Sequence, residues 1–144
     1  MSMTDPNVDR PQTLGALRAS GARALGVRDE IRSNLIRALR AGETLFPGII
    51  GYEESVVPQI TNALLARHDI LLLGLRGQAK TRIARGIAAF LDEVTPVIPG
   101  CPLRSHPLAP AGAFAERAVA EQGDDLPIGW LGRDARYGEK LATP

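Results

Sequence analysis

An apolar run that ends at a glycine is the feature that most constrains the fold of this chain. Residues 69–73 read Asp-Ile-Leu-Leu-Leu, without alternation of apolar and polar positions. Such a short run is typical of a strand covered on both faces, which usually belongs to a parallel sheet. Gly74 and Gly77 then turn the chain, and a helical pattern starts after Thr81. The order strand, glycine loop, helix predicts an α/β fold in which helices flank a parallel sheet.

The loop after this strand resembles a phosphate cradle. It matches the P-loop pattern G-x-x-x-x-G-K-[ST] at three of four fixed positions, with Ala79 in place of the second glycine. Glycines let backbone N–H groups converge on phosphate oxygens, while a lysine binds the β and γ phosphates and a hydroxyl holds Mg²⁺. We therefore predict that ATP and Mg²⁺ bind here, with Mg²⁺ held by Thr81 and the phosphates by Gly74, Leu75, Arg76, Gly77, Gln78, Ala79, Lys80 and Thr81. The alternative is an ordinary strand-to-helix turn with a solvated lysine.

Helical periodicity indicates how the rest of the chain is organised. Apolar residues recur every three or four positions in four further stretches, which predict helices over 27–42, 55–67, 83–92 and 110–122. Gly42 and Gly123 follow two of these stretches, where glycine commonly ends a helix. Residues 1–26 contain two prolines and three glycines, which predict a mobile or loosely docked arm.

Proline and glycine dominate the remaining segments. Five prolines between residues 93 and 110 exclude a helix and leave room only for a short strand at Val97 and Ile98. Residues 123–144 are expected to form loops.

Composition sets limits on partners and compartment. The 144 residues carry 17 Lys and Arg against 16 Asp and Glu, so the net charge of +1 gives no reason to expect a nucleic-acid or membrane partner, and none is predicted. No apolar run approaches the roughly 20 residues of a membrane-spanning helix, and the N-terminus lacks a signal-peptide pattern. Cys101 is the only cysteine, which excludes an intrachain disulfide. A cytoplasmic location is expected.

The stretch LFPGIIGYEESVVPQITNALLARHDILLLGLRGQAKTRIARGIA, residues 45–88, resembles the start of an AAA+ ATPase module of the MoxR and magnesium-chelatase I-subunit branch. Members of that branch have an FPGIIGYE-like entry, a helix, a strand and a P-loop, and MoxR-like members often carry alanine where Ala79 stands. The ending ARYGEKLATP is similar to the segment that leads toward the pore-facing insert of chelatase-like ATPases. The resemblance covers residues 43–144 and implies that Ile49, Ile50 and Gly51 line the adenine pocket.

This resemblance also implies a domain organisation and partners. A flexible arm over residues 1–26 and a helix over 27–42 would precede a partial nucleotide-binding domain over 43–144. In the intact protein such a module assembles into a ring and couples ATP hydrolysis to the remodelling of a protein substrate, or to metal insertion with a chelatase partner.

The acidic residues that hydrolysis requires are missing from the expected place. A P-loop ATPase needs an acidic pair at the end of a second apolar strand, for Mg²⁺ and for the attacking water. Asp92-Glu93 follow a helical pattern and Asp124-Asp125 follow a glycine, so no catalytic residue is identified. Sensor residues and an arginine finger would lie beyond Pro144, and we expect the front part of a longer ATPase. The alternative is a non-hydrolysing module that senses nucleotide or keeps the loop as a relic.

Three other features each admit a functional and a structural interpretation. Cys101 and His106 form at most half of a zinc site, which needs three or four ligands. Trp130 is either an anchor for a partner or a residue packed beneath a loop. Four arginines of the first predicted helix either attract an acidic partner or form a solvated face: Arg28, Arg32, Arg37 and Arg40.

Overall fold

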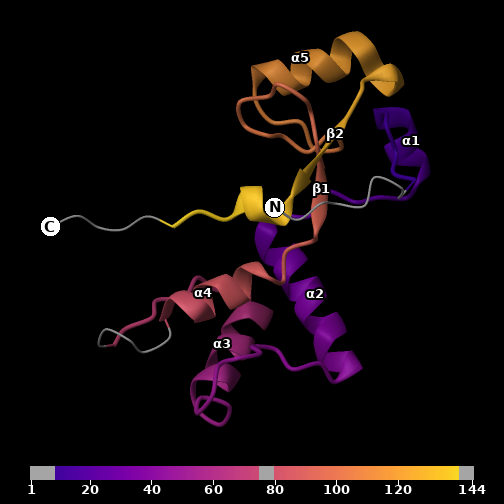
Figure 1. The fold of residues 1–144 in the computed structure, drawn as a ribbon. Coiled ribbons are helices and arrows are strands. Elements are labelled where there is room, and N and C mark those ends of the chain that lie inside the picture. The colour runs from indigo at the N-terminus through magenta and orange to yellow at the C-terminus, as the bar shows by residue number, and fades with distance from the viewer. Residues whose placement is uncertain (1–8, 75–79, 140–144) are drawn as a thin grey trace, which may run out of the picture. The chain divides into compact units, whose positions relative to one another are not determined.

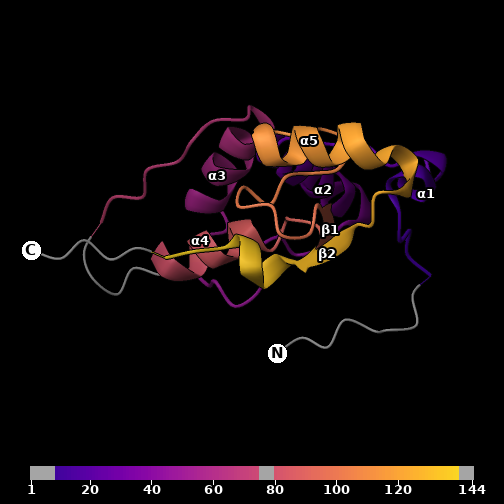
Figure 2. The same cartoon turned by 90° about the horizontal axis from the view of Figure 1, so that it is seen from above.

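The computed structural model describes residues 9–74 and 80–139, which fall into two compact units. The helical unit comprises residues 25–92, and the sheet unit comprises residues 9–24 and 93–139 within the described part of the chain. The elements of each unit can be followed in Figure 1 and, from above, in Figure 2.

The helical unit is built from three amphipathic helices among its described residues: α2 (Val27–Ala41), α3 (Val56–Leu65) and α4 (Lys80–Ala88). The helices predicted over 27–42 and 55–67 are confirmed, whereas the one predicted over 83–92 begins earlier, at Lys80, and ends at Ala88. Their apolar stripes meet in one core because each stripe must be covered by its neighbours. Its buried members are Leu35, Ala38, Phe46, Ile49, Ile60, Leu64, Ile83 and Phe90. Within the described ranges, no helix is long and apolar enough to cross a membrane.

Helix α2 ends at the predicted glycine. Gly42 adopts a left-handed backbone with φ of 68°. Its N–H donates to the Leu39 carbonyl, and the N–H of Glu43 donates to the carbonyl of Ala38 at 3.0 Å. This pair of bonds is the Schellman motif, which satisfies carbonyl groups that the end of a helix leaves without partners.

Helix α3 ends in the same motif without a glycine. Arg67 has φ of 61°, its N–H donates to the carbonyl of Leu64, and the N–H of His68 donates to the carbonyl of Ala63. A left-handed conformation costs a residue with a Cβ about 1 kcal/mol or more. The Arg67 guanidinium binds the carboxylate of Asp29 on α2, so the strained residue also connects the two helices.

A second ion pair lies beside this one. Arg28 donates to both carboxylate oxygens of Asp69, at 2.9 and 3.0 Å. The two ion pairs are crossed: the consecutive residues Arg28 and Asp29 of α2 bind Asp69 and Arg67, respectively, where the chain leaves α3. All four side chains are about half exposed or more, so each pair adds little stability, at most about 1 kcal/mol. Their effect is to orient the chain where it leaves α3.

Residues 69–73, expected to form a buried strand, form no strand in the structure. Ile70 and Leu72 pack against the core of the helical unit, whereas the side chains of Leu71 and Leu73 are 80% and 84% exposed. A strand requires a neighbour to share backbone hydrogen bonds. The described residues place no strand beside this segment, so the parallel sheet stays a prediction.

The sheet unit contains a two-stranded antiparallel sheet, β1 (Val94–Val97) with β2 (Gly129–Gly132). Val94 pairs with Gly132 and Val97 with Gly129. The short strand expected at Val97 and Ile98 therefore lies slightly earlier in the chain. Pro96 is tolerated because a two-stranded sheet leaves one edge of each strand without a partner.

Residues 123–144 were expected to form loops; residues 140–144 lie outside the described part of the chain, and for residues 123–139 the expectation is wrong in part. They contain β2 and two 3-10 turns, η1 (Gly123–Asp125) and η2 (Arg133–Arg136). Helix α5 (Ala113–Gln122) precedes them and ends at Gly123, as predicted, but it begins three residues after Pro110. In Figure 1 the chain between β1 and α5 runs beside this helix.

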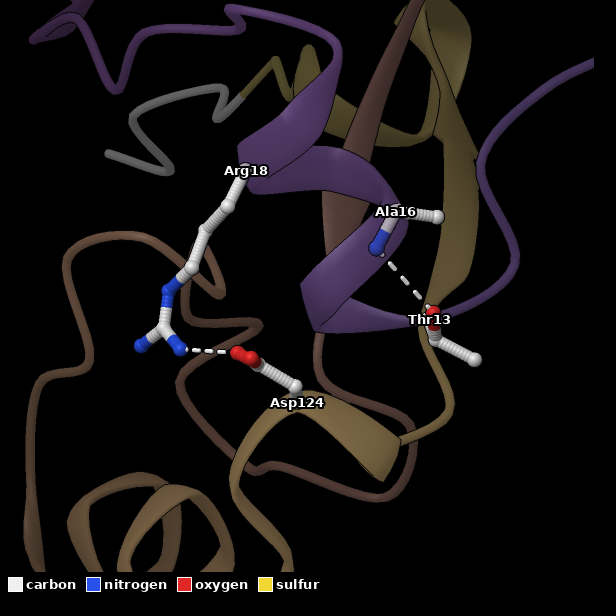
Figure 3. A network of polar contacts seen from close by, with 4 residues as sticks. All are labelled: Thr13, Ala16, Arg18 and Asp124. Atoms are coloured by element: carbon white, nitrogen blue, oxygen red, sulfur yellow. Dashed lines mark hydrogen bonds and ion pairs between the residues drawn. The ribbon is translucent and has the colours of Figure 1, made fainter.

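Part of the expected arm is packed rather than loose. Helix α1 (Leu14–Ala19) buries Leu14 and Leu17, which are 0% and 1% exposed, in the core of the sheet unit. The Oγ1 of Thr13 accepts a hydrogen bond from the N–H of Ala16 at 3.2 Å, which caps the helix. Figure 3 shows this cap together with the ion pair between Arg18 and Asp124, which attaches α1 to η1.

The packing of α1 predicts the effect of truncating Leu17. Leu17→Ala should lower the free energy of unfolding by about 2–5 kcal/mol, because a fully buried leucine leaves a cavity. Trp130 lies in the same unit, so denaturation followed by tryptophan fluorescence measures the loss. Leu103→Ala, at an exposed position of the same unit, is the control and should change stability by less than about 0.5 kcal/mol. Equal effects of the two variants would show that α1 is not packed in solution.

The left-handed Arg67 predicts a second result. Arg67→Gly and Arg67→Ala both remove the ion pair with Asp29, but only glycine also relieves the backbone strain. We expect Arg67→Gly to be more stable than Arg67→Ala by about 1 kcal/mol, measured by urea denaturation followed by circular dichroism. Gly42→Ala, at the equivalent position of α2, should lose a similar amount. If glycine and alanine at position 67 are equally stable, the left-handed conformation is absent in solution.

Candidate functional site

The predicted phosphate site converges on the start of α4. Lys80 is the first residue of this helix and Thr81 the second. The Lys80 ammonium donates a hydrogen bond to the carbonyl oxygen of Gly74, so its side chain turns back toward the start of the loop. Thr81 is exposed. The other predicted phosphate ligands lie outside the described residues: Leu75, Arg76, Gly77, Gln78 and Ala79.

The start of α4 has a positive electrostatic potential. The first N–H groups of a helix lack partners within the helix, and the helix dipole adds about half a positive charge. Helix α4 contains Lys80, Arg82 and Arg85 but no acidic residue in its first turn. Amides, dipole and cationic side chains therefore favour an anion at this end.

A cleft of about 410 Å³ lies between α4 and the loop that precedes α3. Its volume falls in the range of small-molecule pockets, about 300–1,000 Å³. The loop contributes Leu45, Phe46, Pro47, Gly48 and Ile49. Helix α4 contributes Arg82, Arg85 and Gly86, and Ala89 follows directly after the helix. These four residues are spaced at i, i+3, i+4 and i+7, so they lie on one face of α4 and of the turn that continues it.

Of the three residues expected to line an adenine pocket, only Ile49 lines this cleft. Ile49 is buried, and its N–H donates to the carbonyl of Phe46 at 3.2 Å. The side chain of Ile50 is 86% exposed. The N–H of Gly51 donates to the Oε2 of Glu53 at 2.9 Å, which holds the chain as it turns toward α3. Ile49 therefore lines the cleft, whereas Ile50 and Gly51 do not.

Phe46 fixes the loop to α4. Its ring packs edge-on against Phe90, with the ring centroids 6.0 Å apart and the planes at 79°. A Cβ on Gly86 would lie 2.6 Å from a carbon of the Phe46 ring, closer than van der Waals contact permits. Glycine at position 86 is therefore what allows the ring to lie directly on the helix.

Arg82 is a site residue that the sequence motif did not indicate. Its Nη1 donates to the carbonyl oxygen of Gly48 at 3.4 Å, which links α4 to the loop across the cleft. The signal was the spacing of Arg82 and Arg85 on one helical face. The P-loop pattern stops at Thr81 and does not extend to that face.

The other face of α4 borders a second cleft of about 380 Å³ in the helical unit. Its lining is largely apolar and includes Ile31, Leu64 and Ile87. The charged residues at its rim include both arginines of the crossed ion pairs and Asp69. Because those guanidinium groups already bind carboxylates, this cleft is less suited to an anion than the start of α4.

The metal interpretation of Cys101 and His106 receives no support. Across residues 9–74 and 80–139, no group of three His, Cys, Asp or Glu is placed to hold a metal ion. Cys101 is buried in the core of the sheet unit. The Nδ1 of His106 accepts a hydrogen bond from the N–H of Leu108 at 3.1 Å, so this ring helps to shape its loop.

Trp130 packs within the sheet unit. Its Nε1 donates to the carbonyl of Pro11 at 2.9 Å, and the Arg10 guanidinium lies 5.9 Å from the ring centroid. The ring is half-buried and contacts the core of this unit. These contacts favour the packing interpretation over that of a partner anchor.

The four arginines of α2 divide into two kinds. Arg28 binds Asp69, and the Nε of Arg32 donates to the carbonyl of Leu65 at 2.9 Å. Arg37 and Arg40 are exposed, as expected of a solvated face. Two of the four therefore have structural roles within the helical unit.

Comparisons with models of known protein families, with curated proteins and with solved structures find no match to this chain. What the site can bind follows from the chemistry of its own residues.

The contact between Phe46 and Gly86 predicts a coupled pair of substitutions. Gly86→Ala should lower the free energy of unfolding by about 1 kcal/mol, since overpacking costs about 1–3 kcal/mol and outweighs the gain of up to about 1 kcal/mol from alanine in a helix. In a Phe46→Leu background the same change should be neutral or stabilising. A double-mutant cycle by thermal denaturation measures the coupling. Stabilisation by Gly86→Ala alone would contradict the close contact.

Proposed function

We propose that this chain is a Mg²⁺-ATP-binding P-loop module of AAA+ type, similar to MoxR proteins and the magnesium-chelatase I subunit. One observation carries the proposal: the Lys80 ammonium, at the start of α4, turns back onto the carbonyl of Gly74, the first residue of the P-loop pattern. The first turn of α4 contains no acidic residue, which suits this helix start to an anion. The parallel sheet of the P-loop fold is part of this proposal.

The residues at the start of α4 have complementary roles in this proposal. Backbone N–H groups of the first turn donate to phosphate oxygens. The Lys80 ammonium exchanges the neutral carbonyl of Gly74 for β- and γ-phosphate oxygens, which are charged and therefore stronger acceptors. The exposed hydroxyl of Thr81 supplies an oxygen ligand of the kind that Mg²⁺ prefers. Bound Mg²⁺ would neutralise part of the phosphate charge.

The cleft beside α4 is the proposed position of the base. It begins on the helix that carries Lys80, and Ile49 and Gly48 contribute its opposite wall. A purine needs apolar surface on its faces and a few polar groups at its edge. Ile49 and the methyl group of Ala89 supply the first, and the Gly48 carbonyl supplies an acceptor. Contacts from Ile50 and Gly51 stay predictions.

The contacts of the two acidic pairs, Asp92-Glu93 and Asp124-Asp125, favour nucleotide binding without hydrolysis. Asp92 accepts a hydrogen bond from the Asn34 side chain at 2.8 Å, and its N–H donates to Glu30 at 3.2 Å. Asp124 pairs with Arg18. One member of each acidic pair thus has a structural partner within its own unit. This observation supports the alternative of a nucleotide-sensing or interaction module, in which the loop binds ATP without hydrolysing it.

Hydrolysis belongs to the proposal for an intact protein. There the module would assemble into a cytoplasmic ring, in which a neighbouring subunit's arginine stabilises charge in the transition state. Its work would be remodelling of a protein substrate or metal insertion with a chelatase partner.

Replacement of Lys80 tests nucleotide binding directly. Lys80→Ala should weaken binding of Mg²⁺-ATP by about tenfold or more, because a hydrogen bond to a charged group contributes about 1.5–3 kcal/mol. Isothermal titration calorimetry measures the affinity. Arg37→Ala makes the same change in charge on an exposed face of α2 and should leave the affinity unchanged. If the unaltered chain binds no Mg²⁺-ATP, the loop is a relic. If Lys80→Ala binds Mg²⁺-ATP as well as the unaltered chain does, Lys80 does not hold the phosphates and the proposed site is wrong.

A further inference from the structure

We propose that Arg82 positions the base-binding wall of the site and thereby sets its preference for a nucleotide over a bare polyphosphate. This inference rests on the proposed function, because it concerns the same site. Its basis is the hydrogen bond from Arg82 to the carbonyl of Gly48, together with the place of both residues on opposite walls of the cleft.

Helix geometry points the Arg82 side chain away from the residues that are proposed to bind the phosphates. An α-helix turns by about 100° per residue, so side chains two positions apart point to different sides. Lys80 turns toward Gly74, whereas Arg82 reaches Gly48 in the loop before α3. Arg82 is therefore a positioning residue that acts through the loop, and Lys80 is the cation for the phosphates.

Two contacts among the described residues attach the loop to α4, and Arg82 provides one of them. Phe46 is fixed by its contacts with Gly86 and Phe90, toward the far end of the helix. Gly48, with φ of 83°, is held by Arg82 close to the start of the helix. Loss of the guanidinium would leave Phe46 in place and release the other attachment. The effect would reach Ile49, the next residue in the wall.

This arrangement predicts a selective change in affinity. Arg82→Ala should weaken binding of Mg²⁺-ATP by about three- to tenfold, the range expected for one hydrogen bond. Binding of Mg²⁺-tripolyphosphate, which has the phosphates but no base, should change by less than about twofold. Lys80→Ala should weaken both ligands.

Further variants separate the hydrogen bond from the charge. Arg82→Gln keeps a donor without the charge, so it should retain more ATP affinity than Arg82→Ala. Gly48→Ala strains the left-handed backbone at the other end of the bond and should give the same ATP-selective loss without changing any charge. Arg37→Ala is the control for loss of an exposed positive charge. Because Arg82 is exposed, its variants should melt within a few degrees of the unaltered chain.

Calorimetry with the full 144-residue chain gives outcomes that can be told apart. ATP-selective losses in Arg82→Ala and Gly48→Ala support the inference. Equal losses for ATP and tripolyphosphate in Arg82→Ala would overturn it, since Arg82 would then act on the phosphates. Unchanged binding of both ligands would overturn it as well, while leaving the proposed function intact. If the unaltered chain binds neither ligand, the proposed function fails and this inference fails with it.

Discussion

The contact of Phe46 with Gly86 and Phe90 is the constraint on which the arrangement of the helical unit depends. The ring occupies space that any side chain at position 86 would need, so loop and helix approach closely at that point. Close-packed interiors do not deform continuously, and one rigid ring is enough to fix the distance between two backbones. The cleft beside α4 owes its width to this contact, and the hydrogen bond between Arg82 and Gly48 spans it nearer to Lys80.

Long periodic stretches made part of the fold predictable. Helices α2 and α3 have 15 and 10 residues, enough for an apolar stripe to recur, and Gly42 marked the end of the first. Helix α1 has six residues, too few to show a period, and it lay among prolines and glycines that indicated a loose arm. Strand β2 has four residues, of which the first and the last are glycines, and this gave it the composition of a loop.

The candidate site was predictable only where a motif names residues. Lys80 and Thr81 were found because phosphate binding requires a cation and a hydroxyl at fixed spacing from a turn. Arg82 was missed because its role depends on a carbonyl 34 positions earlier in the chain, a separation that no local pattern contains. Ile49 and Ile50 are equally apolar in sequence, and only the turn closed by the Phe46 carbonyl decides which of them is buried.

The alternating exposure of residues 70–73 has a consequence for the behaviour of the chain in concentrated solution. Leu71 and Leu73 present two large apolar side chains to water, in a segment without a neighbouring strand in the described part of the chain. Neighbouring exposed apolar side chains favour association between molecules. Purified material will therefore tend to self-associate as its concentration rises, and a charged substitution at either leucine would improve its solubility without disturbing the core beneath.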